Sequence, residues 1–217
     1  MIELQKRLLT SLLLLIIIFF SLNNFTVLFL FLFSLNFFSL IEFNNLFQNI
    51  YKKKKQLYFV CFFVCLIYIS IFSVIIWNFL TPFNNRNTIS LIFIILICIS
   101  TDTGGFIFGK LLGGKKLTQI SPNKTYSGAL GSFFLSITIG HIYYTFFKKY
   151  LILEINYLIF IIIISLISQF GDLIISFIKR KAKLKDTGSI LPGHGGILDR
   201  IDGVLIALPF GLVLISI

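Results

Sequence analysis

The stretch "EINYLIFIIIISLISQFGDLIISFI", residues 154–178, decides the fold class of this chain. It is apolar over the length that a helix needs to cross the hydrocarbon core of a bilayer, about 20 residues. Comparable runs recur along the whole chain, which is 57% hydrophobic and only 12% charged, whereas soluble domains average about 25% charged residues. The sequence therefore predicts an all-α, polytopic integral membrane protein built as a helical bundle.

Working outward from this run, we predict about seven transmembrane helices. The expected spans are 5–22, 25–43, 57–78, 89–112, 128–147, 154–178 and 197–217. Residues 1–100 would then form an N-terminal membrane region of about three and a half spans. Residues 101–217 would form a catalytic membrane region, because the polar motifs described below all lie there.

The basic residues gather on one side of this predicted topology. Sixteen of the 19 lysines and arginines lie at the N-terminus or in the loops after the second, fourth and sixth spans. By the positive-inside rule these segments face the cytoplasm. The net charge of +11 suits anionic headgroups and phosphates. It does not indicate nucleic-acid binding, because the charge lies in membrane loops.

The aspartates lie in or beside two of the same loops: Asp102, Asp172, Asp186, Asp199 and Asp202. Asp172 lies about 10 Å up a helix from Lys179, at a rise of about 1.5 Å per residue. An ionised group at this depth in the membrane is costly and is a functional candidate by default. The alternative is a structural ion pair, for example between Asp172 and Lys179 or Arg180.

Two predicted helix faces carry groups that suit a metal-bound phosphate. The first combines a carboxylate, a hydroxyl and two cations: Asp172, Ser176, Lys179 and Arg180. The second carries Asp199 and Asp202, three residues apart at the start of the last span. Hard oxygen ligands from two helices are typical of a Mg²⁺ site formed by Asp172, Asp199 and Asp202. Aspartates beside many cations indicate phosphoryl or nucleotidyl transfer.

A polar, glycine-rich strip, "KDTGSILPGHGGILDRIDG" at Lys185–Gly203, separates two apolar runs. Its segment Pro192–Gly196 leaves backbone N–H groups open, so it can wrap a phosphate. Between these glycines and Asp199, His194 could donate a hydrogen bond to a phosphate oxygen. The alternative is a plain flexible turn that returns the chain to the membrane.

The stretch "SFIKRKAKLKDTGSILPGHGGILDRID", Ser176–Asp202, resembles the hallmark of the phosphatidate cytidylyltransferases, also called CDP-diacylglycerol synthases. The segments "DTGGFIFGK" from Asp102 and "SPNKTYSG" from Ser121 resemble two further motifs of that family. Tyr126 and Ser127 depart from the usual Trp and Glu. The motif resemblance covers roughly residues 100–210, and the first 100 match only in hydrophobic character.

This resemblance implies transfer of CMP from CTP to phosphatidate, which yields CDP-diacylglycerol and pyrophosphate, with Mg²⁺ as cofactor and a second cation as an open question. It implies a multi-pass protein, often dimeric, so a homodimer is a candidate assembly. We expect a bacterial inner membrane and an active site that faces the cytoplasm. The implied catalytic residues are Asp172, Asp199, Asp202, Lys179, Arg180, Arg200 and His194. The implied substrate-binding residues are Ser121, Lys124, Thr125, Ser176, Lys185, Asp186, Gly195 and Gly196.

Two alternatives remain open. A related CTP-dependent kinase of polyprenols or phytol would transfer the γ-phosphate to a lipid alcohol, but the complete His-Gly-Gly and Asp-Arg-x-Asp pattern argues against it. A transporter or channel for an organic phosphate would use the same basic cavity. The clustering of aspartates on one side and the absence of an inverted repeat argue against transport.

Overall fold

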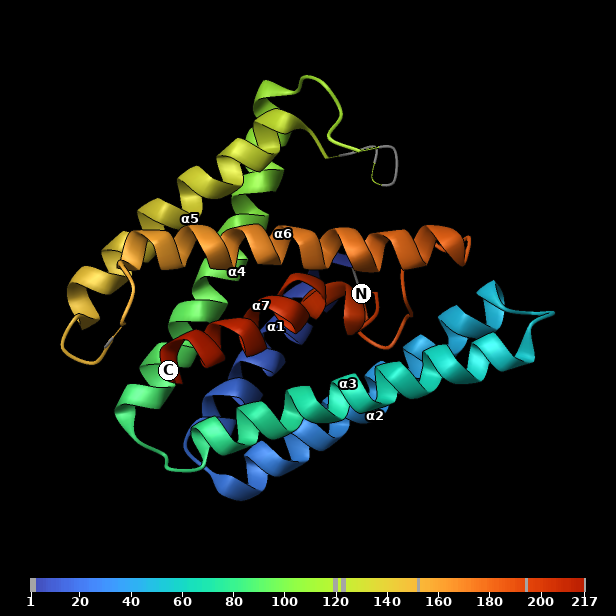
Figure 1. Ribbon diagram of the computed structural model, residues 1–217, viewed down its shortest axis with the longest axis horizontal. Helices are drawn as coiled ribbons and strands as arrows, with labels where there is room; N and C mark the ends of the chain where they lie inside the picture. The colour runs from blue at the N-terminus through green and yellow to red at the C-terminus, as the bar shows by residue number, and fades with distance from the viewer. Residues whose placement is uncertain (1–2, 119–120, 122–123, 152, 194, 217) are drawn as a thin grey trace. The chain divides into compact units, whose positions relative to one another are not determined.

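The computed structural model describes residues 3–118, 121, 124–151, 153–193 and 195–216, and these residues form seven helices and no β-sheet (Figure 1). The helices are α1 (Glu3–Ser21), α2 (Phe25–Ile50), α3 (Lys55–Leu80), α4 (Asn85–Leu112), α5 (Tyr126–Phe147), α6 (Tyr157–Lys181) and α7 (Leu198–Ser216). Five of them, α2 to α6, are long and apolar enough to cross a membrane. The prediction of a polytopic helical membrane protein is therefore confirmed.

α2 departs most from its predicted span. The sequence predicted an end at residue 43, but the helix continues to Ile50. One face of this extension is buried through Phe43, Leu46 and Phe47. Apolar packing on that face keeps the segment helical despite its polar residues. Glu42 lies on this part of α2 and is only 1% exposed.

The chain divides into two compact units. The first comprises Met1–Phe83 and Ile178–Ile201, and thus holds α1 to α3, the end of α6, the glycine-rich strip up to Ile201 and the first turn of α7. The second comprises Asn84–Phe177 and Asp202–Ile217, and holds α4, α5 and most of α6 and α7. The motif residues are therefore shared between the two units. The functional division at residue 100 stays a prediction.

In the first unit, α2 and α3 lie side by side as an antiparallel hairpin (Figure 1). Asn24 caps α2, because its side-chain oxygen accepts the N–H of Thr26 at 3.0 Å. Between the helices, the Ser73 hydroxyl donates to the Asn36 side chain at 2.7 Å. Such polar contacts fix the rotation of apolar helices about their axes, because few other directional contacts exist in a membrane.

In the second unit, small residues bring the helices into close contact. A Cβ atom on Gly104 of α4 would lie 2.5 Å from the backbone oxygen of Gly131 on α5, so a larger residue does not fit. The Thr101 hydroxyl donates to Ser165 of α6 at 2.9 Å. A Cβ atom on Gly171 of α6 would lie 2.7 Å from the backbone oxygen of Asp202 on α7. Gly104 thus lets α4 and α5 approach closely, and the contact at Gly171 places the Asp172 turn of α6 beside Asp202.

Candidate active site

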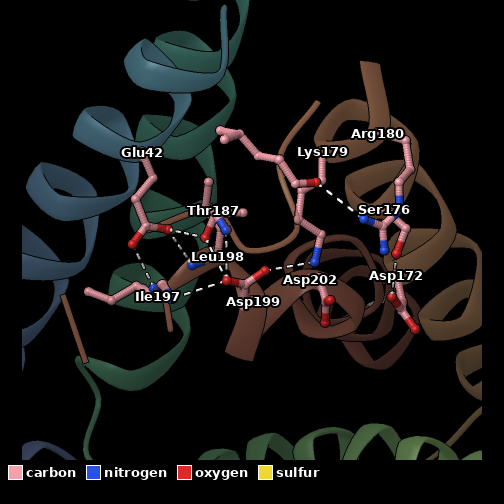
Figure 2. A network of polar contacts seen from close by, with 12 residues as sticks. Glu42, Asp172, Ser176, Lys179, Arg180, Thr187, Ile197, Leu198, Asp199 and Asp202 are labelled. Atoms are coloured by element: carbon pink, nitrogen blue, oxygen red, sulfur yellow. Dashed lines mark hydrogen bonds and ion pairs between the residues drawn. The ribbon is translucent and has the colours of Figure 1, made fainter. Parts of the chain in front are cut away.

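The first unit holds a cluster around Asp199, which we name the Asp199 cluster: Glu42, Lys179, Thr187 and Asp199 (Figure 2). The Lys179 ammonium lies 2.7 Å from Asp199 Oδ1, and the two side chains are only 12% and 7% exposed. Oδ2 of Asp199 accepts the backbone N–H groups of Thr187 at 2.8 Å and Gly196 at 3.0 Å. Hydrogen bonds to an ionised carboxylate favour that form, so the cluster presents a fixed pair of opposite charges.

Two glycines of the strip, Gly195 and Gly196, shape the backbone around the Asp199 carboxylate. Gly195 has φ +83°, a conformation that L side chains rarely adopt. A Cβ atom at Gly195 would also lie 3.2 Å from Asp199 Oδ2. The turn brings the Gly196 N–H back onto a carboxylate in the first turn of α7. The glycines were predicted to cradle a phosphate, and that remains a prediction, but the Gly196 N–H is already bonded to Asp199.

Glu42 is a polar residue of this cluster that the sequence reasoning missed. Its Oε2 accepts the Thr187 hydroxyl at 2.7 Å and the Leu198 N–H at 2.9 Å, and its Oε1 accepts the Ile197 N–H at 2.8 Å (Figure 2). Glu42 lies 145 positions before Thr187 in the chain. The signal that could have found it is the rule applied above to Asp172: an acid among apolar residues of a membrane helix is a functional candidate.

The second unit holds a cluster around Asp172, which we name the Asp172 cluster: Lys124, Asp172 and Ser176. Lys124 forms an ion pair with Asp172 Oδ2, and the side chains are 27% and 25% exposed. The Ser176 hydroxyl donates to Asp172 Oδ1 at 3.2 Å (Figure 2). Asp102 on α4 interacts electrostatically with both charged members. Asp172 thus forms an ion pair, as the alternative reading of the sequence allowed, but its partner is Lys124 and not the suggested Lys179 or Arg180.

The loop before α5 explains how Lys124 is placed. Thr125 caps α5, because its hydroxyl oxygen accepts the Gly128 N–H at 3.1 Å. The Lys124 backbone is held on both sides, since its N–H donates to the Ser121 oxygen at 3.0 Å and its oxygen accepts the Leu117 N–H at 2.8 Å. These bonds give the two hydroxyl residues predicted to bind substrate, Ser121 and Thr125, a structural role, and their binding role stays a prediction.

Ser127 stands where the resembling family has a glutamate. Its hydroxyl donates to the backbone oxygen of Gly113, the C-cap of α4, and also contacts the Thr125 hydroxyl at 2.9 Å. A serine can make both contacts because it is short. Ser127 therefore ties the end of α4 to the start of α5.

The other predicted site residues lie at the edges of these clusters. Arg180 is exposed and its Nη1 donates to the Leu184 backbone oxygen at 3.3 Å. Lys185, Asp186 and Arg200 are also exposed. Asp202 is half-buried, and its Oδ1 accepts the Gly203 N–H at 2.9 Å. His194 lies outside the described residues.

The carboxylates differ in their fit to a magnesium ion. Among the residues that the structure describes, no three His, Cys, Asp or Glu side chains lie close enough to hold a metal. Mg²⁺ commonly binds through one or two carboxylates and substrate phosphates, which suits Asp172 with the nearby Asp202. Asp199 fits less directly, because a metal at its Oδ1 would have to displace Lys179.

Known proteins are similar in sequence to this chain over much of its length. A family model described as "Cytidylyltransferase family" matches residues 2–217. Three curated relatives bear the name phosphatidate cytidylyltransferase. The protein of Bacillus subtilis (strain 168) is 37% identical over 148 residues, which cover 65% of this chain and 54% of that protein. The protein of Helicobacter pylori (strain ATCC 700392 / 26695) is 39% identical over 132 residues, covering 57% and 46%. The protein of Staphylococcus saprophyticus subsp. saprophyticus is 43% identical over 129 residues, covering 58% and 49%.

The chain spans about half the length of these relatives. The family model, however, matches residues 2–217, a range that includes the helices of both units and the residues of the two clusters. Its match is therefore not confined to the glycine-rich strip in which the resemblance is densest. On this match the chain belongs to the cytidylyltransferase family.

Proposed function

We propose that this protein is a phosphatidate cytidylyltransferase, which transfers CMP from CTP to phosphatidate and releases pyrophosphate. The names of the relatives support the substrates. The observation that carries the proposal is the pair of lysine–aspartate contacts, Lys124 with Asp172 and Lys179 with Asp199. Each contact positions a cation that can form a charge-assisted hydrogen bond to a phosphate group.

The proposed reaction needs positioning and charge neutralisation rather than a covalent intermediate. An oxygen of the phosphatidate phosphate attacks the α-phosphorus of CTP. The bond from that phosphorus to the bridging oxygen breaks, and pyrophosphate leaves with the bond's electron pair. Lys179 and Lys124 stabilise the charge on the phosphates, and because carboxylates already orient them, little reorganisation is needed. Arg180, Lys185 and Arg200 are exposed cations that supply further phosphate contacts.

Mg²⁺ would be held by Asp172 and Asp202, and the predicted role of Asp199 as a metal ligand stays a prediction. When bound, the ion neutralises charge on the triphosphate and on the departing pyrophosphate. The Ser176 hydroxyl orients Asp172 through its bond to Oδ1. The proposal leaves open whether a second cation binds and whether the protein forms a homodimer.

The protein is a multi-pass membrane protein, and we place it in a bacterial inner membrane with the active site facing the cytoplasm. The enrichment of basic residues in the loops after α2, α4 and α6 supports this orientation. The lipid substrate would then stay in the inner leaflet while CTP enters from the cytoplasm.

Reporter fusions test this orientation. A reporter joined after Gly113 or after Lys185 should read as cytoplasmic, and one joined after Asn85 as periplasmic, because the positive-inside rule orients the short basic loops. Alkaline phosphatase and a fluorescent protein serve as paired reporters, since each is active on only one side. The reverse pattern would remove the access route for CTP.

Labelled CTP tests the reaction. Purified protein in mixed micelles with phosphatidate and Mg²⁺ should convert α-³²P-CTP into labelled lipid, because the α-phosphate stays with the product. Labelled pyrophosphate should form from γ-³²P-CTP in equal amount. Lipid labelled only from the γ-position would identify a lipid kinase. No labelled product from either nucleotide would contradict nucleotidyl transfer and favour the transport alternative.

A further inference from the structure

Glu42 holds together three points of the glycine-rich strip. Its carboxylate accepts a hydroxyl from Thr187 and backbone N–H groups from Ile197 and Leu198, at 2.7–2.9 Å. Leu198 is the first residue of α7. The first N–H groups of a helix have no partner within the helix, and a carboxylate is a favourable acceptor for them. Glu42 thus caps the N-terminus of α7, although it lies on α2, far away in the sequence.

The strip is shaped to admit this carboxylate. A Cβ atom at Gly196 would lie 1.9 Å from the Thr187 hydroxyl oxygen and 2.6 Å from Glu42 Oε2. A Cβ atom at Gly188 would lie 2.9 Å from Glu42 Oε1. Any larger residue at Gly196 would push Thr187 and Glu42 apart. Close packing against Glu42 and Thr187 therefore explains why these two positions are glycines, and this explanation does not involve a phosphate.

Thr187 links Glu42 to the charged pair. Its hydroxyl lies 2.7 Å from Glu42 Oε2 and 3.0 Å from Asp199 Oδ2, and its backbone N–H donates to the same Oδ2 at 2.8 Å. A hydroxyl has one proton and donates to one oxygen at a time. Donation to Glu42, the nearer oxygen, leaves the backbone N–H to hold Asp199. The position of Glu42 therefore sets the position of Thr187, and Thr187 sets that of Asp199 and its partner Lys179.

We propose that Glu42 is a positioning residue that orients the Asp199–Lys179 pair through Thr187 and the first turn of α7. It lies on α2, far in sequence from the motif strip. Its effect on turnover rests on the proposed function, whereas its hold on the strip does not. The two parts are therefore tested by separate measurements.

Hydrogen exchange tests the hold on the strip. Glu42→Gln keeps the side-chain shape but presents an NH₂ group where the carboxylate presents an oxygen, so at least one of the three donors loses its acceptor. Losing a hydrogen bond to a charged group corresponds to roughly a ten- to hundredfold change in an equilibrium. We expect exchange in residues 185–198 to be faster by this factor, and exchange in α5 to be unchanged.

Glu154→Gln is the matched control, because it makes the same chemical change at an exposed residue. It should leave exchange in residues 185–198 as in the wild type. Equal exchange in Glu42→Gln and wild type would overturn the proposal. If Glu42→Gln does not fold, Thr187→Val removes only the hydroxyl, and unchanged exchange in that variant would overturn it equally.

Kinetics test the effect on the charged pair. Glu42→Gln should lower kcat by roughly tenfold or more and change the KM for CTP by less than about threefold, because Glu42 orients groups that act in the transition state. In the double variant Glu42→Gln with Thr187→Val the two effects should not add, since both break one chain of contacts. Strictly additive effects would show that Glu42 does not act through Thr187. A wild-type protein that forms no labelled lipid would refute the proposed function, and the exchange measurement would still decide whether Glu42 holds the strip.

Discussion

Replacing Lys179 with methionine should lower the free energy of unfolding by about 3 kcal/mol, because it leaves a buried carboxylate without its cation. The Asp199 side chain is only 7% exposed, so water cannot take the place of the ammonium. The loss is expected at the low end of the range for broken buried pairs, since two backbone N–H groups still bond to Asp199 Oδ2. Equilibrium unfolding in detergent micelles measures it.

Two further variants test whether the loss of stability comes from breaking the Lys179–Asp199 pair. Lys53→Met removes an exposed lysine from the α2–α3 loop, and should change stability by less than about 0.5 kcal/mol. The double variant Lys179→Met with Asp199→Asn should regain part of the lost stability, because a neutral amide oxygen can still accept the two backbone N–H groups. It should not regain activity, since the cation is absent. A Lys179→Met protein as stable as Lys53→Met would show that the pair is not buried.

The second large effect is expected at Asp172. Asp172→Asn should lower kcat by about 100-fold or more, the loss of a major electrostatic element. Its effect on stability should be less than about 1 kcal/mol, because the Asp172 and Lys124 side chains are 25% and 27% exposed and solvent screens the pair.

Chelation of divalent cations should abolish activity in the wild type, if Asp172 and Asp202 hold the proposed Mg²⁺.

Labelled-lipid formation in mixed micelles measures both effects, and thermal unfolding of each variant separates activity from folding. Ser176→Ala is an informative companion, because it removes only the hydroxyl that orients Asp172 Oδ1. It should cost less than Asp172→Asn, since the charge remains. A well-folded Asp172→Asn protein with near-normal turnover would remove Asp172 from the metal site.

Most of the fold class could be read from the apolar runs. Each predicted span corresponds to a helix, and the largest deviation is at the end of α2. α2 runs seven residues beyond its predicted end at residue 43 because burial of Leu46 and Phe47 outweighs the polar residues on either side of them. Hydropathy averages over all faces of a helix and cannot register a single buried face.

For the charged residues too, the sequence predicted proximity within one helix but not the contacts between different parts of the chain. The sequence correctly placed Asp172 and Ser176 on one helix face, because a separation of four residues is nearly one helical turn. It did not indicate that Asp172 pairs with Lys124 or that Lys179 pairs with Asp199. Lys124 lies in a loop before another helix, and its position depends on how α5 begins. No local periodicity relates residues from different helices.

The sequence by itself determined the helical membrane class, the family and the positions of the polar motifs, because hydropathy and motif spacing are properties of consecutive residues. Only the tertiary structure decided which charges meet and what holds them. The strip between Lys185 and Gly203 looked like a phosphate-binding loop, yet Gly196 is packed against Thr187 and Glu42, and its N–H is bonded to Asp199. A buried carboxylate selects its donors by distance and direction in space, and Glu42 finds them 145 to 156 residues away along the chain.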